Sequence, residues 1–239
     1  MTEAVGVVVP AHDEETLLPA CLLALRRAAG RVGTPVRLLV VADSCTDRTV
    51  AVAREHGVRV VGIGARNVGA ARAVGMMELL RMMPGLPPAA VWLATTDADT
   101  VVPADWLRRQ LGYANQGWDV VLGTVTVADW SEHPVHVPAA FTARYSSGGE
   151  PHQHVHGANL GIRASAYLAA GGFRALRTAE DHALLAAATK AGCTVLRTGD
   201  IAVQTSARRH ARAPDGFSNL LRTLPPLSEH REPGPPVSA

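Results

Sequence analysis

The chain has 239 residues, of which 47% are hydrophobic but only 4% aromatic, so we expect one domain, or two closely fused halves, with a core of Val, Leu and Ala. Its formal net charge of +2 is too balanced for a nucleic-acid-binding protein, and no apolar run is long enough to span a membrane as a helix. Three scattered cysteines without a Cys-x-x-Cys pattern, and an N-terminus without secretory-signal features, indicate a cytoplasmic protein. Contact of a small face with a membrane surface stays open.

Apolar runs alternate with helical segments over the first hundred residues. Near-continuous apolar runs are typical of strands buried on both faces, and the helices between them imply right-handed crossovers. The pattern therefore predicts an α/β fold with a mainly parallel sheet. The expected strands are 5–9, 36–41, 58–63 and 91–94, and the expected helices are 17–29, 46–56 and 69–83.

The second half of the chain is less regular. Its composition predicts helices at 106–116, 161–170 and 180–191, and strands at 119–128 and 194–197. A Gly- and His-rich stretch, 146–156, is expected to be a loop. Five prolines from Pro225 onward predict a disordered C-terminal tail.

Two carboxylates, Asp97 and Asp99, directly follow the fourth expected strand. Ligands of open α/β sheets bind beyond the carboxyl ends of the strands. Paired carboxylates at such an edge suit Mg²⁺ or Mn²⁺ bridging a diphosphate. The alternative is an ordinary solvated loop that carries two acids.

Polar residues also follow the first three strands. Residues 10–15 read as a rim for a nucleobase, although Asp13 is equally a candidate cap for the next helix. Asp43 ends the second strand, where its carboxylate can accept a hydrogen bond from a base. Asn67 and Gly69 open the third helix and can approach a base or a diphosphate. The glycines of 62–69 do not fit the Gly-x-Gly-x-x-Gly dinucleotide fingerprint.

Taken in order, these motifs resemble the nucleotide-sugar half of a family 2 glycosyltransferase with the GT-A fold. The resemblance continues in the second half and covers about residues 4–212. The matching stretches are Pro10–Glu14, Asp43–Thr49, Asn67–Gly69, Asp97–Asp99, His156–Arg163, Gly171–Phe173 and Ala179–Leu184.

The resemblance implies a GT-A type α/β fold, with a mainly parallel central sheet flanked by helices and a smaller acceptor-side half. Residues 1–100 would bind the nucleotide sugar, 101–212 would bind the acceptor and carry the catalytic base, and 213–239 would be a Pro-rich tail. It implies an inverting sugar transfer from a nucleoside-diphosphate sugar to a small-molecule, lipid or glycan acceptor, with Mg²⁺ or Mn²⁺ as cofactor. Assembly as a homodimer stays open.

The resemblance also assigns roles to residues. Asp181 would be the catalytic base, with Glu180 as the second candidate, although both also suit the start of a helix. Asp97, Asp99 and His210 would bind the metal. The donor would contact Pro10, Ala11, His12, Glu14, Asp43, Asn67, Gly69, Arg72, Asp97 and Ala98.

One departure concerns the diphosphate. Val68 stands where many members carry Lys, so Arg66 or Arg72 would have to supply the positive charge. Arg208, Arg209 and Arg212 would close over the diphosphate, or else form a solvated basic face.

Two features admit other interpretations. His152, His154 and His156 alternate along one segment, which would suit zinc, although neither a nearby Cys nor a His-Glu-x-x-His pattern supports it; otherwise His156 would line the acceptor pocket. Trp130 could stack on a sugar. At the level of function, the alternatives are a nucleotidyltransferase or other nucleotide-binding α/β enzyme, and a non-catalytic nucleotide-sugar binder.

Overall fold

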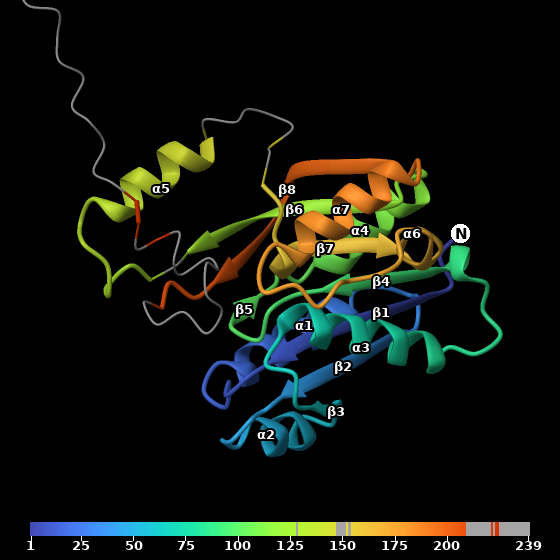
Figure 1. Cartoon of the computed structure of the whole chain (residues 1–239), viewed down its shortest axis with the longest axis horizontal. Coiled ribbons are helices and arrows are strands. Elements are labelled where there is room, and N and C mark those ends of the chain that lie inside the picture. The colour runs from blue at the N-terminus through green and yellow to red at the C-terminus, as the bar shows by residue number, and fades with distance from the viewer. Residues whose placement is uncertain (128, 147–151, 153, 209–220, 222, 225–239) are drawn as a thin grey trace, which may run out of the picture.

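A computed structural model describes residues 1–127, 129–146, 152, 154–208, 221, 223 and 224 (Figure 1). The strands form an eight-stranded sheet in the order β3-β2-β1-β4-β7-β6-β8-β5. The predicted disorder of the Pro-rich tail falls on residues outside the described part of the chain, apart from residues 221, 223 and 224. No helix in the described ranges is long and apolar enough to cross a membrane.

The first half of the chain alternates strands and helices as predicted. β1 pairs in parallel with both β2 and β4, and β2 pairs in parallel with β3. β1 and β4 are buried throughout, as expected for strands covered on both faces. β2 is buried over its last five residues, and the edge strand β3 has no buried residue. The elements are β1 (Ala4–Ala11), α1 (Leu18–Ala29), β2 (Val36–Asp43), α2 (Thr49–Glu55), β3 (Arg59–Ile63), α3 (Val68–Arg81), a 3-10 turn (Pro88–Ala90) and β4 (Val91–Thr95).

The second half adds strands of both directions. β7 lies between β4 and β6 and is antiparallel to both, whereas β6 pairs in parallel with β8, and β8 pairs antiparallel with β5. All strands except β7 and β5 therefore run the same way, so the sheet is mainly parallel as predicted. The elements are β5 (Thr100–Val101), α4 (Trp106–Asn115), β6 (Val120–Val127), α5 (Val137–Ser146), a 3-10 turn (Gly157–Asn159), β7 (Leu160–Arg163), α6 (Ala164–Ala169), α7 (Glu180–Lys190) and β8 (Val195–Thr205).

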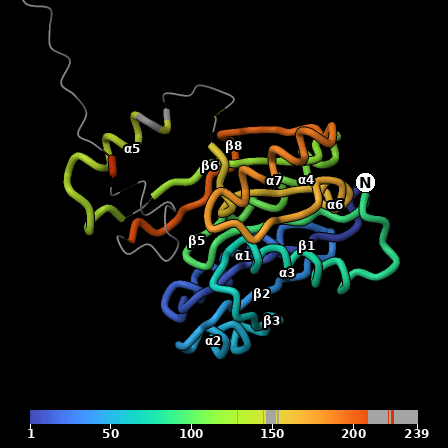
Figure 2. The backbone as a smooth tube through the Cα atoms, in the orientation of Figure 1, coloured from blue at the N-terminus to red at the C-terminus, as the bar shows by residue number. Residues whose placement is uncertain are grey.

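Two expectations for this half are corrected, and two elements were not predicted. The helix expected at 161–170 begins only at Ala164, because Leu160 and Ile162 are buried in β7 between two neighbouring strands. The strand expected at 194–197 runs on to Thr205, since Ile201 and Val203 continue its buried face. Helix α5 and strand β5 were not predicted. Figure 2 traces α5 beyond the carboxyl ends of β6 and β8.

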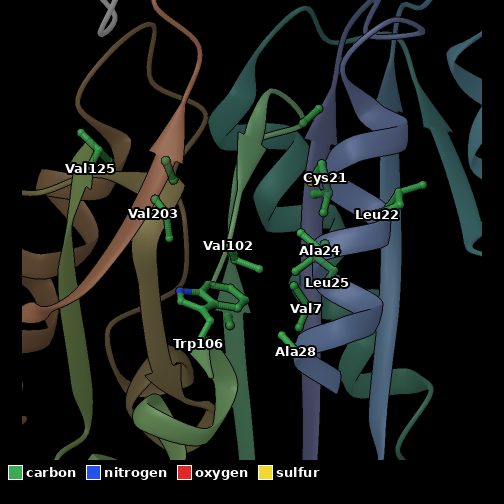
Figure 3. Packing of buried hydrophobic residues seen from close by; sticks show 14 of the residues in the cluster. Val7, Cys21, Leu22, Ala24, Leu25, Ala28, Val102, Trp106, Val125 and Val203 are labelled. Atoms are coloured by element: carbon green, nitrogen blue, oxygen red, sulfur yellow. The ribbon is translucent and has the colours of Figure 1, made fainter. Parts of the chain in front are cut away.

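The core lies on both faces of the sheet. Val5, Val7 and Val9 of β1 pack with α1, α2 and α4, whereas Ala4 and Val8 pack with α3, α6 and α7, as the alternation of strand side chains requires. Figure 3 shows Cys21, Leu25 and other α1 side chains over Val7, with Trp106 nearby in the same cluster.

Helix α3 sits unusually close to the sheet. A Cβ added at Gly75 would lie 2.1 Å from the Val8 side chain, so only glycine allows this approach. Because α3 is held so tightly, its N-terminus is fixed against the carboxyl ends of β1 and β2, where the candidate site lies.

Candidate active site

The loops at the carboxyl edge of the sheet contain unusual backbone. Among the described residues, the non-glycine residues with positive φ are Asp13, Ser44, Arg66 and Ala179, with φ between 47° and 58°. They follow β1, β2 and β3, or immediately precede α7. Such conformations cost energy, and they concentrate at functional sites.

Asp43 holds the loop that follows β3. Its carboxylate accepts hydrogen bonds from the backbone amides of Ala65 (2.8 Å), Arg66 (2.8 Å) and Asn67 (2.7 Å), and from the Ser44 hydroxyl (3.0 Å). Burial alone would raise the pKa of Asp43, but these hydrogen bonds outweigh it and lower the pKa. The carboxylate is therefore ionised and already well supplied with donors; contact with a base stays a prediction.

The loop after β1 is tied to the loop after β2. The carboxylate of Asp13 accepts the amides of Thr46 (2.6 Å) and Asp47 (3.2 Å), and His12 Nδ1 lies 2.7 Å from the carbonyl oxygen of Asp43. The capping role considered for Asp13 on α1 is therefore wrong: α1 has no side-chain cap. Pro10 and Ala11 are the last residues of β1, beside the end of β2.

Asn67 and Gly69 connect α3 to the second half of the chain. Asn67 Oδ1 accepts the Ala70 amide (2.8 Å) and so caps α3, while its Nδ2 donates to the Leu176 carbonyl (2.8 Å). A Cβ on Gly69 would lie 2.2 Å from the Arg174 carbonyl oxygen. Both residues thus bring α3 against the segment that precedes α7.

Arg72 links Asp97 to Glu180. Its side chain is 4% exposed; Nη2 lies 2.5 Å from Asp97 Oδ1, and Nη1 is paired with Glu180 Oε1. The guanidinium also lies over the Phe173 ring, 5.8 Å from its centroid. Burial raises the pKa of Glu180, and the charge of Arg72 opposes that rise. Arg72 therefore joins an acid of the first half to an acid of the second.

Arg208 forms a second bridge. Its Nη2 lies 2.9 Å from Asp99 Oδ2 and 2.8 Å from Glu14 Oε1, and its Nη1 donates to Glu14 Oε2 at 2.9 Å. Burial raises the pKa of Asp99 to about 6, although the Arg208 charge acts against the rise. Ala98, between the two aspartates, is buried.

Asp181 lies at the start of α7. Its Oδ2 accepts the backbone amide of Gly157 (2.9 Å), and its Oδ1 accepts the amide of His182 (2.8 Å). Unlike Glu180, which is buried against Arg72, Asp181 is partly exposed. The Gly157 contact fixes this carboxylate in a position that remains accessible.

The alternating histidines form a stack. The ring centroids of His152 and His154 lie 5.9 Å apart, as do those of His154 and His156, and the rings are nearly parallel. His154 also stacks on Tyr145, with ring centroids 3.8 Å apart. His156 Nε2 is hydrogen-bonded to the Tyr145 hydroxyl, which also accepts the Val125 amide at 3.2 Å. Burial lowers the pKa of His156 to about 4, although the charge of nearby Asp181 opposes this.

This stack does not support the zinc alternative. Within the described ranges, the group of three or more His, Cys, Asp or Glu residues whose ligand atoms lie close enough together for a metal is Asp13, Cys45 and Asp47, and it contains none of the three histidines. The carboxylates of that group already accept backbone amides. Trp130 packs against Phe141, with ring centroids 5.4 Å apart, so sugar stacking by Trp130 stays a prediction.

The residues around Asp97 and Asp99 fit a divalent cation. Oxygen ligands are those that Mg²⁺ and Mn²⁺ prefer. Asp97 is 35% exposed on its side chain, and only its Oδ1 has a side-chain partner among the described residues. His210, Arg209 and Arg212 lie outside the described residues, so the predicted role of His210 stays a prediction.

A hollow lies at the same edge of the sheet, at the ends of β2 and β3. It has a volume of about 380 Å³ and is lined by Ala42, Ser44, Cys45, Val50, Gly62, Ile63 and Gly64. The sequence had pointed to the neighbouring Asp43 but not to this hollow. Two contacts were also not predicted from the sequence, because neither follows from spacing along the chain. These are the hydrogen bond from the Gly157 amide to Asp181 and the pairing of Arg208 with Glu14.

Solved structures share this fold. TarS (residues 1–349) from S. aureus, in complex with UDP-GlcNAc, matches with a TM-score of 0.65 at 15% identity, covering 91% of this chain and 62% of that one. The mannosyltransferase PcManGT from Pyrobaculum calidifontis, in complex with GDP-Man and Mn²⁺, matches with a TM-score of 0.61 at 16% identity, covering 91% and 68%. These likenesses confirm the predicted GT-A fold.

Curated relatives share about half of the chain. An undecaprenyl-phosphate 4-deoxy-4-formamido-L-arabinose transferase of Pectobacterium atrosepticum is 32% identical over 129 residues, 51% of this chain and 36% of the relative. An uncharacterized glycosyltransferase of Mycobacterium bovis is 33% identical over 121 residues, 51% of this chain and 48% of the relative. The chain therefore spans less than half the length of these two proteins. The profile of the family described as glycosyl transferase family 2 matches residues 6–169, more than half of the chain, and the chain belongs to that family.

Proposed function

We propose that this protein is a metal-dependent, inverting glycosyltransferase that moves a sugar from a nucleoside-diphosphate sugar to an acceptor hydroxyl. The observation that carries the proposal is the cluster of Asp97, Asp99, Glu180 and Asp181 at the carboxyl edge of a family 2 fold. Arg72 bridges Asp97 and Glu180, and Arg208 joins Asp99 to Glu14. The cluster also includes a partly exposed carboxylate, that of Asp181, which is held by the Gly157 amide.

The donor half would be residues 1–100. The hollow at the ends of β2 and β3 and the residues at the end of β1 are the proposed surroundings of the nucleotide, with Asp43 fixing the loop between them. Asp97 and Asp99, with His210, would hold Mg²⁺ or Mn²⁺, which supplies positive charge that stabilises a departing diphosphate. Two of the proteins with a similar fold were solved in complex with Mn²⁺, one together with GDP-Man and the other together with UDP.

The acceptor half would be residues 101–212. Asp181 would take the proton from the acceptor hydroxyl while the hydroxyl oxygen attacks the anomeric carbon. The bond from that carbon to the diphosphate oxygen breaks with its electron pair on the diphosphate, and the configuration inverts. A positioned base of this kind contributes about 10²–10⁴-fold to the rate.

Glu180 has a different part in this proposal. It is buried and paired with Arg72, so it would position Asp97 and the start of α7 rather than receive the proton. Asp181 is thereby favoured over Glu180 as the base.

Acceptor, assembly and location are less constrained. The Pectobacterium relative is named for transfer involving undecaprenyl phosphate, and a glucosyl-3-phosphoglycerate synthase of Mycobacterium tuberculosis has a similar fold, with a TM-score of 0.53 at 18% identity. Lipid and small-molecule acceptors are therefore both proposed, beside a glycan. Location in the cytoplasm and a homodimer stay predictions.

Binding and transfer are to be measured separately. We expect UDP or GDP to raise the melting temperature with Mn²⁺ or Mg²⁺ present and not with EDTA. We expect Asp181→Asn to keep this shift but to lose transfer in a screen of nucleotide sugars read by product mass. His182→Gln, a change at the adjacent residue, serves as the matched control. No shift with any nucleotide and metal would contradict the donor assignment, and unchanged turnover of Asp181→Asn would remove Asp181 from the base role.

A further inference from the structure

Arg208 forms an ion pair with Asp99, one of the two aspartates proposed to bind the metal. It follows β8 directly and places one guanidinium between two carboxylates from distant parts of the chain, Glu14 after β1 and Asp99 after β4. The side chains of Glu14 and Asp99 are 6% and 11% exposed. Three nitrogen–oxygen distances of 2.8 to 2.9 Å hold the guanidinium there.

The contact falls on a specific oxygen. Arg208 Nη2 lies 2.9 Å from Asp99 Oδ2, and the other oxygen, Oδ1, faces the hydroxyls of Thr100 (3.4 Å) and Thr205 (3.5 Å). Two cations cannot share Oδ2 at bonding distance without strong repulsion. A divalent ion that binds Asp99 through this oxygen therefore competes with Arg208.

The two arginines of the cluster differ in their freedom to move. Arg72 is 4% exposed and is held by acids from two sides, with its guanidinium over the Phe173 ring. Arg208 is 23% exposed, and the described contacts of its side chain are those of the guanidinium with Glu14 and Asp99. A guanidinium has the planar fork that matches phosphate oxygens in pairs.

We propose that Arg208 is a donor-binding residue that is stored on Asp99 and Glu14: the metal displaces it from Asp99, and the released guanidinium binds the diphosphate. This inference rests on the proposed function. It predicts that Arg208 weakens binding of the metal alone and strengthens binding of the nucleotide in the presence of metal. A structural ion pair would not act with opposite signs on the two ligands.

The first measurement is titration of the nucleotide-free protein with Mn²⁺, followed by the loss of the free Mn²⁺ electron paramagnetic resonance signal. Arg208→Gln is expected to bind Mn²⁺ about tenfold more tightly or more, the range measured for close charge pairs. Arg48→Gln removes the same charge from an exposed pair with Glu55 and is expected to match the wild type. Equal or weaker Mn²⁺ binding by Arg208→Gln would overturn the proposal.

A second variant separates contact from charge. Arg208→Lys keeps the positive charge but replaces the fork with a single ammonium, so its Mn²⁺ affinity is expected to lie between those of the wild type and Arg208→Gln. If Arg208→Gln does not fold, the Mn²⁺ affinity of Arg208→Lys tests the proposal in its place. If Arg208→Lys bound Mn²⁺ with the same affinity as the wild type, the proposal that the metal displaces Arg208 from Asp99 would be overturned.

The third measurement adds UDP or GDP at saturating Mn²⁺ and follows the heat of binding. Arg208→Gln is expected to bind whichever nucleotide the wild type binds about tenfold more weakly, because it lacks a charged phosphate contact. Unchanged nucleotide affinity would overturn the donor-binding role. If neither nucleotide binds the wild type, the proposed function and the donor-binding role fail, while the Mn²⁺ titration still tests the competition.

Discussion

Arg72 gives the most direct test of how the two halves of the chain are joined. Replacing it with Met keeps most of the side-chain length but removes the guanidinium that lies 2.5 Å from Asp97 and pairs with Glu180. The Glu180 side chain, 7% exposed, then remains buried without a cation. Breaking a buried pair in this way costs about 3–5 kcal/mol, so Arg72→Met is expected to lower the free energy of unfolding by that amount at neutral pH.

The assay is urea unfolding followed by tryptophan fluorescence. Arg59→Met is the matched control, because Arg59 pairs with Glu78 at 2.7 Å but is 58% exposed; exposed pairs contribute about 0–1 kcal/mol. Adding Glu180→Gln to Arg72→Met removes the stranded charge and should recover part of the loss. Losing Arg72 should also leave Glu180 with a raised pKa, so the folded variant binds an extra proton and its deficit should shrink as the pH falls. A loss below about 1 kcal/mol, or equal losses for Arg72→Met and Arg59→Met, would refute this reasoning.

Three further predictions follow from single residues. Asp43→Asn should cost about 2–3 kcal/mol in urea unfolding, because an amide offers one acceptor oxygen to three backbone N–H groups and turns its own donors toward them. Gly69→Ala should destabilise by about 1–3 kcal/mol as its Cβ meets a carbonyl oxygen, whereas Gly112→Ala, which meets nothing within 4 Å in α4, should stabilise by about 0.5–1 kcal/mol; equal effects would contradict the close approach of α3. His156 has a lowered pKa of about 4, so the unfolded chain binds more protons between that value and about 6.5, and stability should fall as the pH drops through this window. Melting temperatures at pH 7 and pH 5 should show a smaller drop for His156→Gln than for the wild type, and an equal drop would contradict the assignment.

The first half of the fold was predictable because its signals are local. Runs such as residues 36–41 are apolar except for Arg37, and a helical segment follows within a few residues. A parallel sheet is the arrangement that such alternation allows. The second half mixes directions, and there the pattern was ambiguous: Leu160 to Ala170 contains a short strand followed at once by a helix, and the two together have the composition of one helix.

The sequence predicted which residues lie at the carboxyl ends of the strands, but it did not predict which partners their side chains contact. Parallel strands bring their carboxyl ends to one edge, so Asp43 and Asp97 were expected there. What each carboxylate binds depends on backbone geometry that spacing does not encode. Asp43 holds three amides because Arg66 adopts a positive φ, and Asp181 meets the Gly157 amide across a separation of 24 residues.

The charges of the site determine the order in which ligands can enter. Glu14, Asp97, Asp99, Glu180 and Asp181 contribute five carboxylates, and the described residues that bridge them supply two guanidinium groups, so negative charge is in excess. A diphosphate that approached this cluster alone would meet net repulsion, and Arg208, the more exposed of the two bridging arginines, is engaged by two acids. A divalent cation at the proposed site would relieve both obstacles, because it would reduce the excess charge and release Arg208 from Asp99. From the arrangement of the acids and arginines we therefore expect nucleotide binding to need the metal, independently of any role the metal has in bond breaking.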